Sequence, residues 1–305
     1  MSHLTEYPTS TNEVRAPFDI EPLTVRTGAV IRGVKLGGDL PEPVITAIRQ
    51  ALLRHKVIFF RGQNHLDEAS HEAFTSRLGT LLPHPARDPL AGTRATLNLD
   101  SRDTRSSTWH ADLTFLNSFP QISVLRGVTI PPLGGDTLWA NTATAYEHLP
   151  ASLKEFVDRL WAIHSNVFDY SALIPAGSAN AEVFHQRLSK REIVETEHPV
   201  VNVHPETGER TLLLGHFVRR IVGFNSSDSA HLLAILNNHA TADENVVRWR
   251  WTQGDVVIWD NRATLHKAVD DYGQTERIVR RVTVAGTRAT SVDGRVSLTR
   301  SEAAA

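Results

Sequence analysis

The 305-residue chain contains no cysteine. Disulfide bonds, zinc sites with thiolate ligands and cysteine nucleophiles are therefore excluded. The chain also lacks a run of the ~18 apolar residues that a membrane-spanning helix requires, and its polar N-terminus lacks the apolar segment of a secretory signal. From these absences we expect a cytoplasmic protein that does not associate with a membrane.

An excess of charge of one sign is lacking as well. The sequence has 32 basic and 34 acidic residues, a net charge of −2. Such a balance offers no electrostatic basis for binding nucleic acid, so none is expected as a partner. The length suffices for one substantial core. We therefore expect a single domain over residues 1–305, with loose tails at 1–17 and 289–305.

The first 80 residues mix helix and strand patterns. Residues 20–36 indicate a short strand pair with a turn. Residues 56–60 form a short apolar run that is typical of a buried strand. Helices are predicted after Pro41, where apolar residues follow the helical period, and after Asp67, which is a favourable N-cap.

From about residue 95 onward, short strand-like runs recur between turn signals. They lie at 95–99, 108–115, 122–130, 136–140, 199–204, 210–214, 246–251, 255–259 and 278–285. Helical periodicity interrupts them at 151–163 and about 227–239. Residues 170–195 are polar and irregular, which favours a loop that could act as a lid. The pattern predicts a mainly β fold with inserted helices and a jelly-roll core, that is, a double-stranded β-helix.

One apolar, β-favouring run carries the pattern His-x-Asp. In a strand, residues two apart point to the same face, so His110 and Asp112 would present an imidazole and a carboxylate side by side. Two histidines and one carboxylate, with open positions opposite them, are typical of non-haem Fe(II) oxygenases. The candidate for the second histidine is His266, which follows the strand-like run ending at Trp259.

Three further residues are candidates for binding anions. Arg277 and Arg281 are four apart and share one strand face, whereas Arg280 points the other way. Guanidinium groups bind carboxylates and sulfur or phosphorus oxyanions at two points. Thr137 follows a double-glycine turn at the head of a predicted strand. Each feature alone has a simpler alternative: a hydrogen-bonded or surface histidine, a salt-bridged arginine pair, or an ordinary turn.

The joint order of these features resembles the taurine dioxygenase family of Fe(II)- and 2-oxoglutarate-dependent dioxygenases, over about residues 20–286. The resemblance is carried by the segments WHADLTF, GGDTLW, VRWRW and WDNRATLH and by the arginines that follow them. The spacings also agree with the family pattern. They are 27 residues from His110 to Thr137, and 11 and 15 residues from His266 to Arg277 and Arg281.

The resemblance implies roles for eight residues. Iron would be held by His110, Asp112 and His266, and 2-oxoglutarate by Thr137 and Arg277, with O2 as the second co-substrate. The organic substrate would contact His84, Leu113 and Arg281, with Arg281 holding its anionic group. His84 has a plain alternative as a loop histidine between two prolines. The family also implies a homo-oligomer, a dimer or a tetramer.

Two positions bear on the substrate. Where taurine enzymes of the family carry a tyrosine and an asparagine, this chain has Arg87 and Ser106. An added cation disfavours the ammonium group of taurine, because like charges repel. Residues 138–150, 160–166 and 204–219 are more similar to the alkylsulfatase branch of the family.

The resemblance to that branch implies hydroxylation of the carbon next to the sulfate oxygen of alkyl sulfate esters. The products would be an aldehyde and sulfate, with succinate and CO2 as co-products. One alternative is a dioxygenase of a sulfonate or an aryloxyalkanoate. Another, from a different class, is a metal-holding jelly-roll binding protein without turnover.

Overall fold

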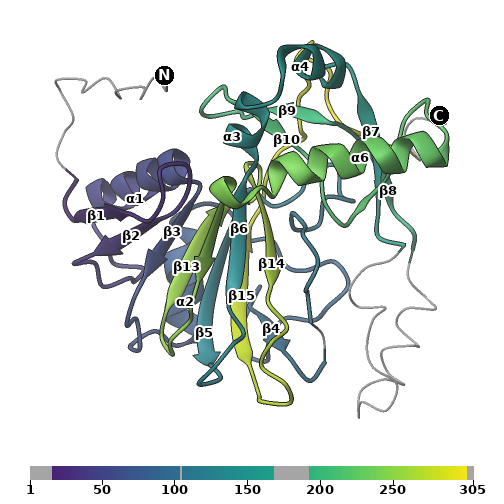
Figure 1. Ribbon diagram of the computed structural model, residues 1–305. Helices are drawn as coiled ribbons and strands as arrows, with labels where there is room; N and C mark the ends of the chain where they lie inside the picture. The colour runs from purple at the N-terminus through teal and green to yellow at the C-terminus, as the bar shows by residue number, and fades with distance from the viewer. Residues whose placement is uncertain (1–15, 104, 168–191, 301–305) are drawn as a thin grey trace.

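The computed structural model describes residues 16–103, 105–167 and 192–300 (Figure 1). Its largest element is a seven-stranded sheet with the order β1-β2-β3-β13-β5-β15-β4. These strands are β1 (Asp19–Pro22), β2 (Ala29–Arg32), β3 (Val57–Phe60), β13 (Val256–Asp260), β5 (Ile122–Thr129), β15 (Ile278–Val284) and β4 (Leu97–Asp100). Strands β13, β5 and β15 lie side by side and are antiparallel, and they form the centre of the sheet.

A three-stranded sheet packs against the large one. Its order is β12-β6-β14, with β12 (Val246–Trp249), β6 (Thr137–Asn141) and β14 (Thr264–Ala268). Apolar side chains from both sheets join one buried cluster, in which Phe59 stacks on Trp249 at 4.3 Å between ring centroids. Trp139 meets Phe59 edge to face at 5.5 Å. The two sheets and the cluster between them form the predicted jelly-roll core.

The central strands are buried on both faces. In β13, Val256 and Ile258 join the cluster beneath the N-terminal helices, whereas Val257 and Trp259 join the cluster between the sheets. Alternate residues of a strand point to opposite faces. A strand that is covered on both sides therefore has a continuous apolar sequence, which explains why the run at 255–259 lacks alternation.

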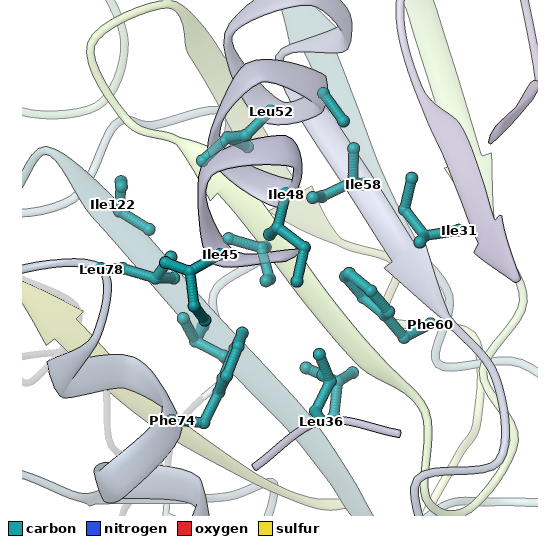
Figure 2. Packing of buried hydrophobic residues seen from close by; sticks show 14 of the residues in the cluster. Ile31, Leu36, Ile45, Ile48, Leu52, Ile58, Phe60, Phe74, Leu78 and Ile122 are labelled. Carbon is teal, nitrogen blue, oxygen red and sulfur yellow. The ribbon is translucent and has the colours of Figure 1, made fainter. Parts of the chain in front are cut away.

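Helices α1 (Glu42–His55) and α2 (Glu68–Ser76) cover the outer face of the large sheet (Figure 2). Ile45 and Ile48 of α1 and Phe74 of α2 pack with Ile58 of β3. Asp67 is the N-cap of helix α2, and its carboxylate accepts a hydrogen bond from the backbone N–H of Ser70, as the sequence predicts.

The remaining elements form the other end of the molecule. A four-stranded sheet has the order β11-β7-β8-β16, and β9 and β10 form a hairpin. The strands are β7 (Trp161–Ser165), β8 (Glu195–Pro199), β9 (Val201–Val203), β10 (Arg210–Leu212), β11 (Val218–Ile221) and β16 (Leu298–Thr299). The helices are α3 (Thr142–Glu147), α4 (Ala151–Val157), α6 (Ser226–Ala240) and the 3-10 turn η2 (Asp243–Asn245).

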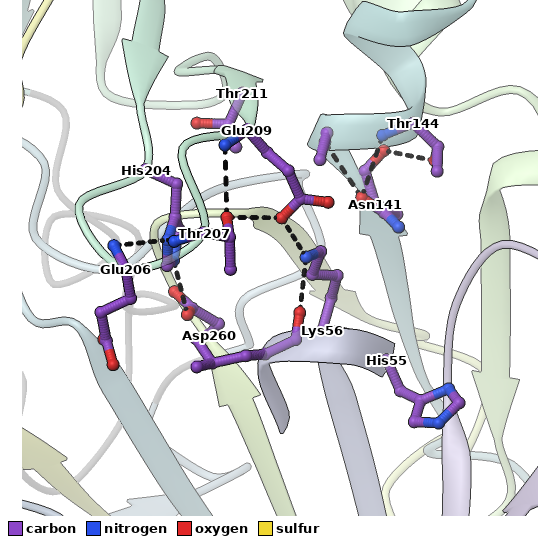
Figure 3. Close-up of polar contacts among 12 residues, drawn as sticks. His55, Lys56, Asn141, Thr144, His204, Glu206, Thr207, Glu209, Thr211 and Asp260 are labelled. Carbon is purple, nitrogen blue, oxygen red and sulfur yellow. Dashed lines mark hydrogen bonds and ion pairs between the residues drawn. The ribbon is translucent and has the colours of Figure 1, made fainter. Parts of the chain in front are cut away.

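A polar network fixes the end of β13 (Figure 3). His204, in the loop between β9 and β10, donates from Nε2 to Asp260 Oδ2 at 2.9 Å. Its Nδ1 accepts from the backbone of Glu206, which sets the tautomer. Burial raises the pKa of the Asp260 carboxyl, but the Arg262 guanidinium and His204 together hold that pKa well below its usual range. The buried carboxylate is therefore ionised and anchors the corner after β13.

The structure confirms the fold class but corrects two predicted elements. The predicted helix 151–163 ends at Val157, and Trp161–Ser165 is strand β7, because this segment pairs with β8. The predicted strand 108–115 is wrong as well. His110 forms only an isolated bridge, and residues 112–115 form a turn in which Leu113 has a φ of 53°.

The predicted loose C-terminal tail is wrong for residues 289–300. Ala289 and Ser297 are buried, and β16 pairs with β8. Ser297 Oγ bonds to His198 Nδ1 at 2.6 Å, so the segment is part of the core. Most of the predicted N-terminal tail and of the predicted lid at 170–195 falls outside the described residues. Within the part of the chain that is described, we find no helix with both the length and the apolar composition that crossing a membrane demands.

We expect His198 alone to make the protein about 3 kcal/mol less stable at pH 4 than at pH 7. Burial lowers the pKa of His198 from 6.5 to about 4. Between these values the unfolded chain binds a proton that the folded chain does not, so this stability is fully present above pH 6.5 and is lost as the pH falls. Urea unfolding at several pH values between 4 and 7 measures the slope of the free energy of unfolding against pH. The His198→Gln variant should have a shallower slope, and an unchanged slope would contradict the assignment.

Candidate active site

Three buried side chains, His110, Asp112 and His266, converge at one point. Their possible ligand atoms all lie within 4.8 Å of one another. The Nε2 atoms of His110 and His266 lie 3.9 and 3.8 Å from Asp112 Oδ1. The two histidines are held together by reciprocal backbone hydrogen bonds of 3.0 and 2.8 Å, the closely spaced pair of an antiparallel bridge.

Asp112 is positioned by a turn and not by a strand. The left-handed backbone of Leu113 bends the chain directly after the carboxylate. The Asp112 backbone is fixed by Asn261, whose Oδ1 accepts from the Asp112 N–H at 2.7 Å and whose Nδ2 donates to the Asp112 carbonyl at 3.0 Å. Ser123 Oγ donates to Asp112 Oδ2 at 2.9 Å, whereas Oδ1 faces the two imidazoles and the Arg281 guanidinium.

The protonation of the three residues suits a divalent metal. Burial lowers the pKa of His110 and His266, so both imidazoles are neutral near pH 7. His110 Nδ1 donates to the Thr108 carbonyl at 2.9 Å, so the lone pair lies on Nε2. Burial raises the pKa of Asp112, but the adjacent Arg281 guanidinium holds it well below its usual range. Two neutral imidazoles and one carboxylate match the donor set of a non-haem Fe(II) site.

One pocket contains all the residues singled out from the sequence. Its walls include His84, His110, Asp112, Leu113, Thr137, His266, Arg277 and Arg281. The structure thus brings together side chains from the loop before β4, the segment 110–113, β6, β14, and the segment that leads into and forms β15. The same pocket is lined by apolar residues that the sequence patterns did not single out, among them Leu97, Leu99, Phe217 and Val279.

Two residues that line the pocket, Arg277 and Thr137, contact each other. Arg277 Nε donates to the Gly135 carbonyl at 2.9 Å, and Nη2 donates to Thr137 Oγ1 at 3.3 Å. The Gly135 N–H donates to Asp271 Oδ1 at 2.8 Å. Gly135 has a φ of 71°, and a Cβ there would lie 3.0 Å from Arg277 Cδ. The double-glycine turn therefore lets the backbone approach the guanidinium closely.

A second group of polar side chains also lines the pocket. Arg281 contacts the Asp112 carboxylate through Nη1. Burial, together with the charges of Arg281 and Arg87, lowers the pKa of His84 to about 3. Because the Ala86 N–H donates to His84 Nδ1 at 3.1 Å, the neutral ring carries its proton on Nε2 and can donate from there.

Asn261 and Trp251 contribute to this site but received no role from the sequence. Trp251 Nε1 donates to Thr137 Oγ1 at 3.0 Å. Both residues lie in segments that carry the resemblance, VRWRW and WDNRATLH. Their position in these segments was the one sign in the sequence that they contribute to the site. Local periodicity cannot identify the contact partner of a side chain when that partner lies more than 100 residues away in the sequence.

Comparisons with known proteins agree with this geometry. The model of the family described as "Taurine catabolism dioxygenase TauD, TfdA family" matches residues 19–283. The chain is 53% identical over 283 residues to an alpha-ketoglutarate-dependent sulfate ester dioxygenase of Pseudomonas putida, covering 92% of this chain and 94% of the relative. It is 49% identical over 281 residues to an alkylsulfatase of Acinetobacter baylyi, covering 91% and 88%.

A solved structure shows the same fold. The crystal structure of a taurine dioxygenase from Burkholderia xenovorans superposes with a TM-score of 0.78 at 38% identity, covering 92% of this chain and 94% of that one. The family model and both relatives span most of the chain, including all three residues of the His–Asp–His cluster. The chain therefore belongs to the TauD, TfdA family and is an Fe(II)- and 2-oxoglutarate-dependent dioxygenase.

Proposed function

We propose that this protein is an alkyl sulfate dioxygenase. It hydroxylates the carbon next to the sulfate oxygen of an alkyl sulfate ester, and the product breaks down to an aldehyde and inorganic sulfate. O2 and 2-oxoglutarate are consumed, and succinate and CO2 are released. The observation that carries this proposal is one pocket in which a His–Asp–His donor set meets two buried arginines, Arg277 and Arg281. The names of the two relatives from Pseudomonas and Acinetobacter support the choice of substrate.

In this proposal the Nε2 atoms of His110 and His266 and the Oδ1 atom of Asp112 would hold the iron. The iron, when bound, would activate O2 and supply the oxidising chemistry. Hydrogen bonds within the protein fix the positions of the metal-binding side chains. The reciprocal backbone bonds of the two histidines and the hydrogen bonds of Asn261 and Ser123 hold the three donor atoms in place.

Thr137 and Arg277 bind the distal carboxylate of 2-oxoglutarate. Arg277 is buried and is fixed by the Gly135 carbonyl, so its remaining N–H groups are available to a carboxylate in the pocket. A buried guanidinium and a hydroxyl side by side recognise a carboxylate through charge-assisted hydrogen bonds. A metal-holding protein without turnover has no need of this pair.

Arg281, His84 and Leu113 bind the organic substrate. Arg281 supplies the charge for the sulfate group, and the His84 Nε2–H supplies a neutral donor. Apolar side chains in the same pocket, including Leu97 and Leu99, offer a surface for the alkyl group. The substrate is thus a small organic anion with an apolar tail.

A sulfonate dioxygenase is the second candidate, because the similar Burkholderia structure carries the name taurine dioxygenase. Arg87 argues against taurine itself. It lines the same pocket as Arg281 and His84, and its positive charge lowers the pKa of His84, so this charge acts near the side chains proposed to bind the substrate. The ammonium group of taurine would meet this positive charge, whereas an alkyl chain would not.

Product analysis distinguishes these functions. The Fe(II)-loaded enzyme is supplied with 2-oxoglutarate and O2 and then with a medium-chain alkyl sulfate, taurine or an aryloxyacetate. We expect sulfate, aldehyde and succinate in equal amounts with the alkyl sulfate, and little turnover of the others. Sulfite release from taurine without turnover of any alkyl sulfate would refute the proposed substrate but not the enzyme class.

We expect Arg281→Gln to raise the KM for an alkyl sulfate by about 10- to 100-fold, the loss of one charge-assisted contact. The Kd of 2-oxoglutarate should change less than about threefold, since Arg277 is intact. Arg280→Gln is the matched control, because Arg280 pairs with Glu68 away from the pocket. Equal effects of the Arg281 and Arg280 changes on KM would contradict the anchoring role.

Several further expectations stay predictions. They are the cytoplasmic location, the absence of membrane association, the assembly into a dimer or tetramer, the absence of a nucleic-acid partner and the organisation of residues 1–305 as one domain. Size-exclusion chromatography with light scattering would test the assembly directly.

A further inference from the structure

The Thr137 hydroxyl has two donors and must itself donate elsewhere. Trp251 Nε1 lies 3.0 Å and Arg277 Nη2 lies 3.3 Å from Thr137 Oγ1. An indole N–H and a guanidinium N–H can only donate, so both occupy lone pairs of the hydroxyl oxygen. The single hydroxyl proton is left to point away from both, and Thr137 is one of the residues that line the pocket.

Rigid surroundings fix this arrangement. The Trp251 ring is 4% exposed and packs in the cluster between the sheets, where its centroid lies 6.5 Å from that of Trp139. The guanidinium of Arg277 is held by the Gly135 carbonyl, and the Gly135 N–H is held by Asp271. Neither donor to Thr137 can therefore turn away without breaking other contacts.

We propose that Trp251 is a positioning residue that sets the direction of the Thr137 hydroxyl proton. The indole N–H of Trp251 binds the lone pair of Thr137 Oγ1 that faces the core. The Thr137 hydroxyl proton is therefore already oriented to donate to the distal carboxylate of 2-oxoglutarate. The inference rests on the proposed binding of 2-oxoglutarate by Thr137 and Arg277. A hydroxyl that is already aligned loses little rotational freedom on binding, which strengthens its contact with the ligand.

The Trp251→Phe variant tests this role, because it keeps a ring in the cluster and removes only the N–H. The probe is 2-oxoglutarate, titrated by calorimetry into Mn(II)-loaded protein, so that no turnover is needed. We expect the Kd to rise by about tenfold, the effect of one hydrogen bond. The Kd of 2-oxobutyrate, which lacks the distal carboxylate, should not change.

Trp249→Phe is the matched control. Its indole N–H donates to Asp255 at 3.2 Å and its ring stacks on Phe59 in the same cluster, but it does not contact Thr137. We expect this variant to bind 2-oxoglutarate as the wild type does. If both tryptophan variants weakened binding equally, Trp251 would act through packing alone and the inference would be overturned.

A double-variant cycle separates positioning from a general effect. In a Thr137→Val background the hydroxyl is gone, so Trp251→Phe should no longer change the Kd of 2-oxoglutarate. A full tenfold loss in that background would overturn the inference. Failure of the wild type to bind 2-oxoglutarate at all would instead refute the proposed function, so the two failures are distinguishable.

Discussion

Asp112→Ala should remove stable Fe(II) binding and, with it, turnover. The variant retains two neutral imidazoles but loses the carboxylate oxygen that lies 3.8–3.9 Å from both. It also leaves the buried Arg281 guanidinium without its counter-charge at the position where a dication must bind. Loss of a group that only hydrogen-bonds to a metal ligand weakens metal binding by about 10- to 100-fold, so loss of a ligand and its charge should weaken it by more than about 100-fold.

Metal content after dialysis against Fe(II) without oxygen measures this loss, and succinate formation measures turnover. Ser123→Ala is the graded control. It removes one hydrogen bond to Asp112 Oδ2 and keeps the ligand oxygen, so it should weaken iron binding within the 10- to 100-fold range. Wild-type iron content and oxygen-dependent succinate formation by Asp112→Ala would contradict the assignment of Asp112 as a ligand.

The sequence predicted the residues of this site better than their backbone. A strand was predicted for 108–115 because the run is apolar and β-favouring, but the chain turns after His110 at the positive φ of Leu113. The pairing of His110 with Asp112 survives because the turn also brings the carboxylate back to the imidazole. The strand argument correctly placed Arg277 and Arg281 in one pocket and Arg280 outside it, facing Glu68, although Arg277 directly precedes β15 and is not part of it.

Contacts between distant segments could not be predicted in this way. The C-terminal segment is polar, and its order comes from pairing with β8 and from the bond between Ser297 and His198. Helical periodicity at 151–163 was likewise overridden after Val157, where pairing with β8 turns the chain into a strand. Local patterns report which face of an element is apolar, but they do not identify the partner that satisfies its polar groups.

Among the residues that make contacts between distant segments, Asn261 is the one whose substitution should lower stability most. Its side chain makes three hydrogen bonds to buried backbone: from the Asp112 N–H at 2.7 Å, to the Asp112 carbonyl at 3.0 Å and to the Pro120 carbonyl at 2.9 Å. We expect Asn261→Ala to lower the free energy of unfolding by at least about 3 kcal/mol, since each of the three buried groups left without a partner costs at least about 1 kcal/mol. Urea unfolding of the metal-free protein measures this change.

Asn202→Ala is the matched control. Asn202 is also buried, but its Oδ1 accepts from one backbone group, Thr290 N–H at 3.0 Å, away from the cluster of His110, Asp112 and His266. We expect this variant to lose less stability and to keep its iron affinity. A loss of less than about 1 kcal/mol in Asn261→Ala would contradict the role of Asn261 in fixing the Asp112 turn.

The effect of Asn261→Ala on iron should be separable from its effect on folding. At low temperature and without denaturant, near-ultraviolet circular dichroism identifies the fraction that remains folded. Within that fraction the Asp112 backbone is no longer tied to the corner after β13, so its carboxylate must be ordered when the metal binds. We therefore expect about 10- to 100-fold weaker iron binding by folded Asn261→Ala, the range for loss of a supporting hydrogen bond. Wild-type iron affinity in the folded fraction would mean that Ser123 and the bend at Leu113 hold the carboxylate without Asn261.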